Sequence, residues 1–231
     1  MLRVALTRAK EDIQKDKALF EGEGFQVVEL PLIKEVALRF EVPEVKFDFV
    51  VFQSPRAVRL FLSRHRLSDE KIVAVGEKTK RAVESEGYKV WAVPEEYYSG
   101  AIVELFRGKR GRVLIPRSAI GRDEVVEGLK ALGLEVFPLE VYTVEPVLYE
   151  ESELVDKLKP CHAVVFASPS AVKGLVANLP KERAISLLEG KRLVCIGKTT
   201  KEVLNSLLGV ECLMPEKPTM EKVVELLKSL A

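Results

Sequence analysis

The 231-residue chain contains few of the residues that build metal centres and disulfide frameworks. Its three cysteines, Cys161, Cys195 and Cys212, form no CxxC pair, and its two histidines, His65 and His162, stand in unrelated surroundings. An odd number of scattered cysteines indicates neither a disulfide framework nor a zinc site. We therefore expect the cysteines to be buried small side chains, and we expect no metal site and no catalytic histidine.

Long apolar runs and a large net charge are also missing. The longest uniformly apolar runs have four or five residues, whereas a spanning helix needs about 18 or more, and "MLRVALTRAK" lacks the long apolar region of a signal peptide. The net charge is +1, with 31% charged residues, and the basic run "RGKRGR" (107 to 112) reads as a solvated loop. We expect a cytoplasmic protein that binds neither membranes nor nucleic acid. Two asparagines and three glutamines are few, a bias found in proteins from hot environments.

Glycine-rich nucleotide motifs are absent, although "CIGKTTKEV" (195 to 203) contains Gly-Lys-Thr. A phosphate-binding loop needs another glycine five residues before that Gly-Lys pair, and Arg192 stands there. "GEGFQV" has Val27 in place of the third glycine of a dinucleotide fingerprint. The chain also shows no catalytic triad and no paired acid motif. Any chemistry must therefore depend on positioning, anion binding and at most one weak acid.

The sequence does contain a regular alternation of short apolar runs and amphipathic stretches. This alternation is typical of βαβ units whose mainly parallel sheet is covered on both faces. It predicts an α/β fold with ten strands in two five-stranded, doubly wound parallel sheets. The ten runs are "RVALT", "QVVEL", "FVVF", "IVAVG", "KVWAV", "RVLIP", "EVFPL", "AVVFA", "LVCIG" and "VECLM".

The two halves of the chain are related by an internal duplication. "VVFQSPRAV" (50 to 58) matches "VVFASPSAV" (164 to 172), and "AVGEKTKRAV" (74 to 83) matches "CIGKTTKEVL" (195 to 204). "RVALTRA" (3 to 9) likewise matches "RVLIPRS" (112 to 118), and "GFQVVEL" matches "GLEVFPL". Because the lysine of "GKT" shifts by one residue between the copies, the shared element is a strand-to-helix turn and not a phosphate loop.

These turns predict where a ligand binds. In open α/β sheets, ligands lie beyond the carboxyl ends of the strands, where helix N-termini offer free N–H groups. Ser54 and Ser168 are expected as N-caps, each followed by a proline at the first helical position. With arginines and lysines nearby, such turns suit a ligand that carries several dispersed carboxylates. A purely structural role as helix caps remains open.

The ordered set of motifs resembles the uroporphyrinogen-III synthase family over the whole chain. The motifs are "LTRA", "VVFQSPRAV", "AVGEKTKRAV", "VLIPR", "VYTVEP", "VVFASPSAV" and "CIGKTTKEVL". The resemblance implies a discontinuous first domain (residues 1–33 and 149–231), a second domain (39–139) and two crossing linkers (34–38 and 140–148). The linkers would form a two-stranded β-ladder that acts as a hinge over a cleft.

The resemblance also implies the reaction, in which hydroxymethylbilane loses water and closes with ring D inverted. Tyr142 matches the tyrosine of the family motif, and a phenol that is protonated at neutral pH can assist the loss of hydroxide. Packing at the hinge is the alternative role for Tyr142. The implied substrate-binding residues are Thr7, Arg8, Gln53, Ser54, Arg56, Gly76, Thr79, Arg117, Ser168, Ser170, Thr199 and Thr200.

The sequence departs from the family pattern at Gln53 and Ala167, where the family often has threonine. No cofactor is implied, and the expected partner is the small-molecule substrate. We expect a monomer whose contact with hydroxymethylbilane synthase, if it forms, is transient. Two alternatives remain at this stage: a two-lobed α/β protein that binds a small anion, and a diverged family member with another tetrapyrrole or none.

Overall fold

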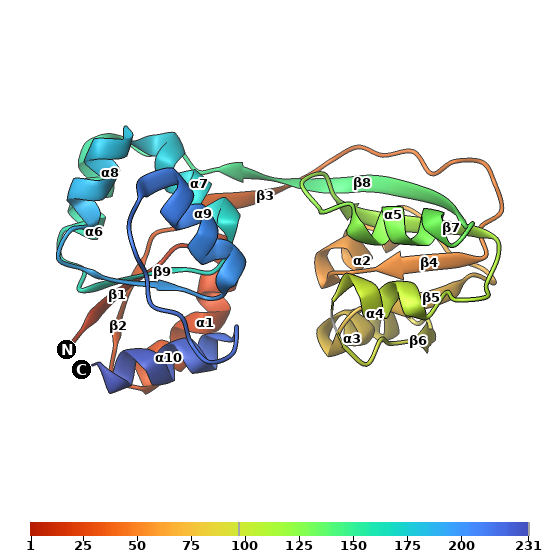
Figure 1. The fold of residues 1–231 in the computed structure, drawn as a ribbon, viewed down its shortest axis with the longest axis horizontal. Coiled ribbons are helices and arrows are strands. Elements are labelled where there is room, and N and C mark those ends of the chain that lie inside the picture. Colours follow the sequence, from red (N-terminus) through yellow and green to blue (C-terminus); the bar gives the residue numbers. More distant parts are fainter. Residues whose placement is uncertain (97, 231) are drawn as a thin grey trace. The chain divides into compact units, whose positions relative to one another are not determined.

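The computed structural model describes residues 1–96 and 98–230, which form alternating strands and helices (Figure 1). The chain divides into two compact units, which we call unit 1 (Met1–Glu35 and Glu145–Ala231) and unit 2 (Val36–Val144). The chain passes from one unit to the other within strands β3 (Ile33–Ala37) and β8 (Glu135–Pro146), which are neighbours in one sheet.

Unit 1 contains a parallel four-stranded sheet in the order β10-β9-β1-β2. Successive residues of β1 face opposite sides: Ala5 belongs to one apolar cluster, and Val4 and Leu6 to the other. Helices α6 to α9 contribute to the first cluster and helices α1 and α10 to the second. The elements are β1 (Arg3–Leu6), α1 (Lys10–Gly22), β2 (Gln26–Glu29), α6 (Glu151–Leu158), β9 (Ala163–Phe166), α7 (Pro169–Asn178), α8 (Lys181–Leu188), β10 (Arg192–Cys195), α9 (Lys198–Leu208) and α10 (Met220–Ser229).

Unit 2 contains most of a six-stranded sheet in the order β3-β8-β7-β4-β5-β6. Phe52 and Leu114 face helices α2 and α3, whereas Val51 and Val113 face helices α4 and α5. A sheet covered by helices on both faces buries its strands completely, which explains the unbroken apolar sequence of β4. The elements are β4 (Phe49–Phe52), α2 (Pro55–Leu62), β5 (Lys71–Ala74), α3 (Glu77–Ser85), β6 (Val90–Ala92), α4 (Ser99–Glu104), β7 (Arg112–Ser118) and α5 (Glu124–Ala131).

Strand order confirms the duplication that the sequence predicts. The matched motifs pair β9 with β4, β10 with β5, β1 with β7, and β2 with β8. The order β10-β9-β1-β2 in unit 1 therefore repeats the order β5-β4-β7-β8 in unit 2. The paired helices also cover corresponding faces, because α7 and α9 share one face in unit 1 as α2 and α3 do in unit 2.

The predicted distribution of ten strands in two five-stranded sheets is wrong. The sheets have four and six strands, because β3 joins the sheet of unit 2 beside β8. "EVFPL" and the linker "EVYTVEP" form one continuous strand of 12 residues, β8. The tenth predicted strand, residues 210–214, makes only an isolated bridge between Leu213 and Val194. The neighbouring Glu211 is instead held by α9, where Asn205 donates a hydrogen bond of 2.9 Å to it.

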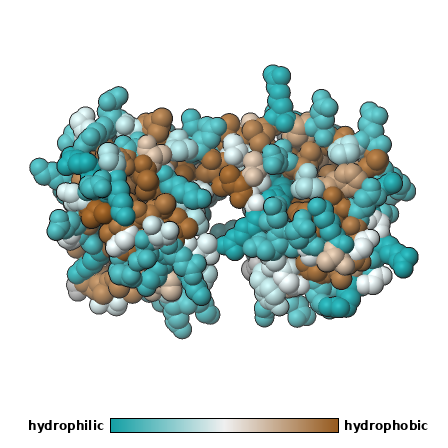
Figure 2. Space-filling view, turned by 45° about the horizontal axis from the view of Figure 1, so that its top comes forward, coloured by the Kyte–Doolittle hydropathy of each residue, from teal (hydrophilic) through white to brown (hydrophobic). Residues whose placement is uncertain are grey.

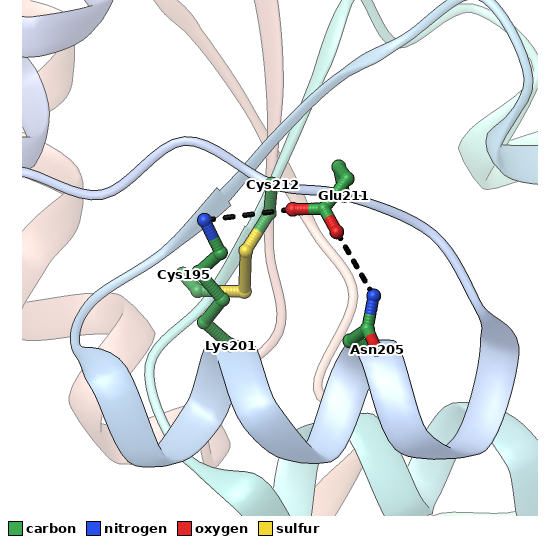
Figure 3. Close-up of a disulfide and its surroundings, with 5 residues drawn as sticks. All are labelled: Cys195, Lys201, Asn205, Glu211 and Cys212. Carbon is green, nitrogen blue, oxygen red and sulfur yellow. Dashed lines mark hydrogen bonds and ion pairs between the residues drawn. A yellow bond between two sulfur atoms is a disulfide. The ribbon is translucent and has the colours of Figure 1, made fainter.

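The prediction that the cysteines indicate no disulfide is also wrong. Cys195, at the end of β10, is bonded to Cys212 (Figure 3). The bond joins the edge strand of unit 1 to the segment that leads from α9 to α10. Sequence spacing missed the pair because the partners are 17 residues apart and meet only when α9 turns the chain back. The expected burial of all three cysteines is confirmed, and Cys161 is a free buried thiol.

Three close contacts in unit 1 hold the segments next to β3 and β8. The hydroxyl of Tyr149 donates a 2.7 Å hydrogen bond to the carbonyl of Pro31, and the Tyr149 backbone N–H donates one of 2.7 Å to Asn178. On α7, Gly174 faces the carbonyl oxygen of Leu32 so closely that an added Cβ would overlap it. Glycine is therefore required for the close approach of this helix to the chain before β3.

Hydrophilic side chains are spread over the visible face of both units, with smaller apolar areas between them (Figure 2). No helix among residues 1–96 and 98–230 is long and apolar enough to cross a membrane.

Candidate functional site at the carboxyl edges of the sheets

Two helices begin with the same serine-proline turn directly beyond a central strand, as the sequence predicts. Ser54 caps α2 after β4, and its Oγ accepts a 3.1 Å hydrogen bond from the Ala57 backbone N–H. Ser168 caps α7 after β9, and its Oγ accepts one of 3.2 Å from Ala171. Each serine uses one acceptor position for its cap, and its hydroxyl hydrogen can still be donated.

Arg56 and Ser170 occupy equivalent positions in the first turns of α2 and α7, and both are partly buried. The turns are therefore the same in backbone and cap, but they differ in charge at this position.

A second pair of helices begins with glycine at the ends of β5 and β10. Gly76, the N-cap of α3, has a φ of 88°, a left-handed conformation that favours glycine. Gly197, the N-cap of α9, is extended instead, so the two copies differ here. Thr79 and Thr200, which the duplication pairs, are almost completely buried, whereas Thr199 is exposed. Thr199 is thus the threonine of this turn whose side chain faces solvent.

Tyr142 lies on β8 beside the Ser54 cap. Its hydroxyl oxygen is 3.3 Å from Ser54 Oγ, and either atom can be the donor. The ring packs in the apolar cluster of α2 and α3, and only 9% of the residue is exposed. Packing and hydrogen bonding therefore both fix this phenol at the N-terminus of α2. The partial positive charge of a helix N-terminus makes this a favourable place for developing negative charge.

Three sequence-predicted residues are engaged within their own unit. The Thr7 hydroxyl donates a 2.7 Å hydrogen bond to the Val165 carbonyl, which joins β1 to β9, and the residue is fully buried. Arg8 pairs with Asp16 on α1 at 2.7 Å. Arg117 pairs with Asp123 at 2.9 Å, directly before α5. The two arginines, matched by the duplication, both hold the turn that follows their strand.

Acidic side chains at the carboxyl edge of unit 1 form ion pairs and hydrogen bonds with neighbouring side chains. Glu29, the last residue of β2, receives hydrogen bonds from Lys17 at 3.0 Å and Gln14 at 2.8 Å. The hydrogen bond from Lys17 holds the pKa of the Glu29 carboxyl below its ordinary value, and the same contact raises the pKa of Lys17. With Asp16 paired to Arg8, the edge combines cations, capped turns and compensated acids.

Gln53, the first residue after β4, lines a hollow of about 380 Å³ at the carboxyl edge of unit 2. Tyr98, at the start of α4, and Arg122, in the connection between β7 and α5, line the same hollow. Sequence reasoning missed both residues. Comparison of the two halves could have indicated Arg122. Ala9 matches Ser118, and helix α1 begins directly after Ala9, whereas residues 119–123 separate Ser118 from helix α5.

A larger hollow, of about 1060 Å³, lies at the opposite edge of the unit 2 sheet. Residues 40–47, 64–66 and 68–70 line it, and these segments precede β4 and β5. Because ligands of open α/β sheets bind at the carboxyl ends of the strands, size does not make this hollow the candidate site. Among residues 1–96 and 98–230, no group of three or more His, Cys, Asp or Glu side chains is arranged to hold a metal ion.

Comparisons with known proteins identify the family of the chain. The family model described as uroporphyrinogen-III synthase HemD matches residues 14–225. A protein of Archaeoglobus fulgidus that bears the same family name is 31% identical, with 99% of each chain covered. The chloroplastic uroporphyrinogen-III synthase of Oryza sativa is 28% identical over 96% of this chain and 78% of its own.

The fold agrees as well. The crystal structure of the Helicobacter pylori synthetase superimposes with a TM-score of 0.72 at 21% identity and covers all of both chains. A mutant synthase of Thermus thermophilus gives a TM-score of 0.65 at 20% identity, with 99% of this chain and 98% of the other covered. The family model and the relatives span nearly the whole sequence. The chain therefore belongs to the uroporphyrinogen-III synthase family.

Proposed function

We propose that this protein is a uroporphyrinogen-III synthase, a lyase that cyclises hydroxymethylbilane with loss of water and inversion of ring D. The observation that carries the proposal is the repeated carboxyl edge, where turns capped by Ser54 and Ser168 present helix N-termini. Tyr142 adds one weakly acidic hydroxyl beside the first of these turns. Neutral donors and helix N-termini suit the dispersed carboxylates of a linear tetrapyrrole.

The first chemical step breaks the bond between carbon and the terminal hydroxyl. The electron-rich pyrrole supplies the electron pair, and the departing oxygen takes a proton and leaves as water. In the proposed arrangement, Ser54 donates its hydroxyl hydrogen to Tyr142, and the phenolic hydrogen of Tyr142 points to the leaving oxygen. This direction suits the capping geometry, because Ser54 Oγ already accepts the Ala57 N–H. A positioned general acid of this kind contributes ~10²-fold or more to a rate.

The second step requires orientation more than further acid or base groups. Loss of water leaves an azafulvene electrophile, and the substituted carbon of ring D attacks it to give a spiro intermediate. This intermediate fragments by breaking the bond between that carbon and its original bridge carbon. The freed bridge carbon then bonds to the unsubstituted carbon of ring D, which loses its proton and balances the proton taken by the leaving hydroxyl, so that the ring is inverted. Binding contacts that are stronger in the spiro-like transition state than in the bound bilane accelerate this route over direct closure. Arg56, Thr199 and Ser170 are the proposed additional contacts, since they lie in the first turns of helices at the two edges.

We further propose that the enzyme works without a cofactor, as a cytoplasmic monomer that meets hydroxymethylbilane synthase only transiently.

The experiment is a turnover assay with freshly prepared hydroxymethylbilane and no added cofactor. The purified protein should consume the bilane well above the spontaneous rate of closure. Binding of uroporphyrinogen without accelerated turnover would refute the synthase assignment and favour a diverged tetrapyrrole-binding member. Tight binding of small anions with no effect of tetrapyrroles would favour an anion-binding protein.

A further inference from the structure

The hollow beside Gln53 lies at the topological switch point of the unit 2 sheet. From β4 the chain proceeds to β5 and β6 on one side, and from β7 it proceeds to β8 on the other. The connecting helices cover opposite faces, so a crevice opens beyond the carboxyl ends of the neighbouring strands β4 and β7. Ligands of doubly wound sheets bind in this crevice. Gln53 follows β4 and Arg122 follows β7, which places the hollow there.

The loop that carries Arg122 is ordered by Arg117. The Arg117 guanidinium donates to the carbonyls of Gly121 and Ser118 and pairs with Asp123. Only 10% of the Arg117 side chain is exposed, so this guanidinium forms an internal support of loop 119–123. Arg117 therefore positions the loop. Arg122 is the arginine of this loop that lines the hollow.

Arg122 and Tyr98 offer two different kinds of contact in the hollow. The Arg122 side chain is 66% exposed and forms an ion pair of 3.7 Å with Glu124, whose side chain is also exposed. Tyr98 is 59% exposed and its ring lies over Gly100, where any side chain would collide with it. An exposed aromatic ring and a guanidinium that line the same hollow fit a flat ring that bears a carboxylate.

We propose that this hollow holds one pyrrole ring of the tetrapyrrole, with Tyr98 against the ring and Arg122 paired with one of its carboxylates. The inference rests on the proposed function and names residues that the family motifs do not include. The volume of about 380 Å³ is at the lower end of small-molecule pockets and suits one substituted ring. Gln53 directly precedes Ser54 in the chain, so the hollow and the Ser54–Tyr142 pair adjoin the same turn after β4.

Glu124 allows the proposed subsite to be distinguished from a purely structural ion pair. A substrate carboxylate has to compete with Glu124 for Arg122, because both acids approach the same guanidinium. Removal of the arginine should therefore weaken substrate binding, and removal of the glutamate should strengthen it. A purely structural ion pair would give two changes of the same sign.

The test compares steady-state kinetics of variants with hydroxymethylbilane. Arg122→Gln should raise KM about fivefold and reduce the dependence of KM on ionic strength, whereas Glu124→Gln should lower KM about twofold. Tyr98→Ala should raise KM about threefold, and Tyr98→Phe should leave it unchanged because the ring remains. The matched control is Arg107→Gln, since Arg107 forms an exposed ion pair with Glu104 before β7, at the other end of the strand.

Each outcome has one interpretation. Equal KM values for Arg122→Gln, Arg107→Gln and the wild type would overturn the subsite while leaving the synthase assignment intact. A rise in KM for Glu124→Gln as well would also overturn it. A wild-type protein that does not accelerate consumption of the bilane would overturn both proposals.

Discussion

The Cys195–Cys212 bond should stabilise unit 1 substantially. It closes a loop between residues 17 positions apart, which contains α9 and the turn at Gly209. Loop-closure entropy for a ring of this length predicts a stabilisation of about 3 kcal/mol. Because Cys195 is fully buried and Cys212 is 8% exposed, solvent reductants have poor access to the bond in the folded protein. Reduction should therefore need prior unfolding.

To test this, the disulfide is reduced in denaturant and the protein is refolded with its thiols kept reduced. For a unit of this size, a loss of about 3 kcal/mol corresponds to a fall in Tm of roughly 10 °C. Scanning calorimetry of the oxidised and reduced forms measures this difference. A Cys161→Ala background is the matched control, since Cys161 is the free buried thiol and its removal should leave the oxidised-to-reduced difference unchanged.

Thiol titration under denaturing conditions tests the bond itself. Of the three cysteines, the unreduced protein should titrate one and the reduced protein all three. Three reactive thiols without reductant would show that the bond is absent. Identical unfolding temperatures for the oxidised and reduced forms would refute the argument from loop closure.

Further predictions concern five single substitutions. Tyr142→Phe should lower kcat ~10²-fold with the fold intact, as a turnover assay can show. Ser54→Ala should lower kcat and also reduce the free energy of unfolding by about 1 kcal/mol, because it removes a helix cap. Ser168→Ala should reduce the free energy of unfolding by a similar amount with a smaller change in kcat, which denaturation and turnover assays can show. Gly174→Ala should destabilise the protein by about 1–3 kcal/mol in denaturant titrations, because its Cβ would overlap a backbone carbonyl. Tyr149→Phe should cost about 1 kcal/mol at neutral pH through its lost hydrogen bond. Burial raises the pKa of the Tyr149 phenol in the folded protein. The contribution of the phenol to stability is therefore complete below pH ~10 and is lost as pH rises through the folded pKa. When the free energy of unfolding is measured against pH, Tyr149→Phe should lose less stability at alkaline pH than the wild type.

Much of the fold could be predicted from local patterns. Short apolar runs set the strands, and serine-proline turns set the starts of α2 and α7, because an N-cap is decided by residues close in sequence. The duplication implies that the two units share one strand order, since equivalent units pack in the same way, and they do share it. These features need no knowledge of distant contacts.

The features that sequence reasoning missed depend on distant contacts. The pairing of Cys195 with Cys212 requires the path of the chain around α9. Periodicity did not mark β3 as a strand of the unit 2 sheet, whereas the family resemblance did predict the ladder that β3 forms with β8. Arg8 matches a family motif, but its acid partner lies eight residues further along the chain, on the helix that follows. Side-chain partners of this kind decide whether a cation is available to a ligand.

The distribution of product isomers tests the central claim most directly. Hydroxymethylbilane closes spontaneously to the uninverted type I product, so a protein that directs ring D must change the product and not only the rate. With freshly prepared bilane and no cofactor, the wild-type protein should yield mainly uroporphyrinogen III. Type I product alone, formed at the spontaneous rate, would contradict the account.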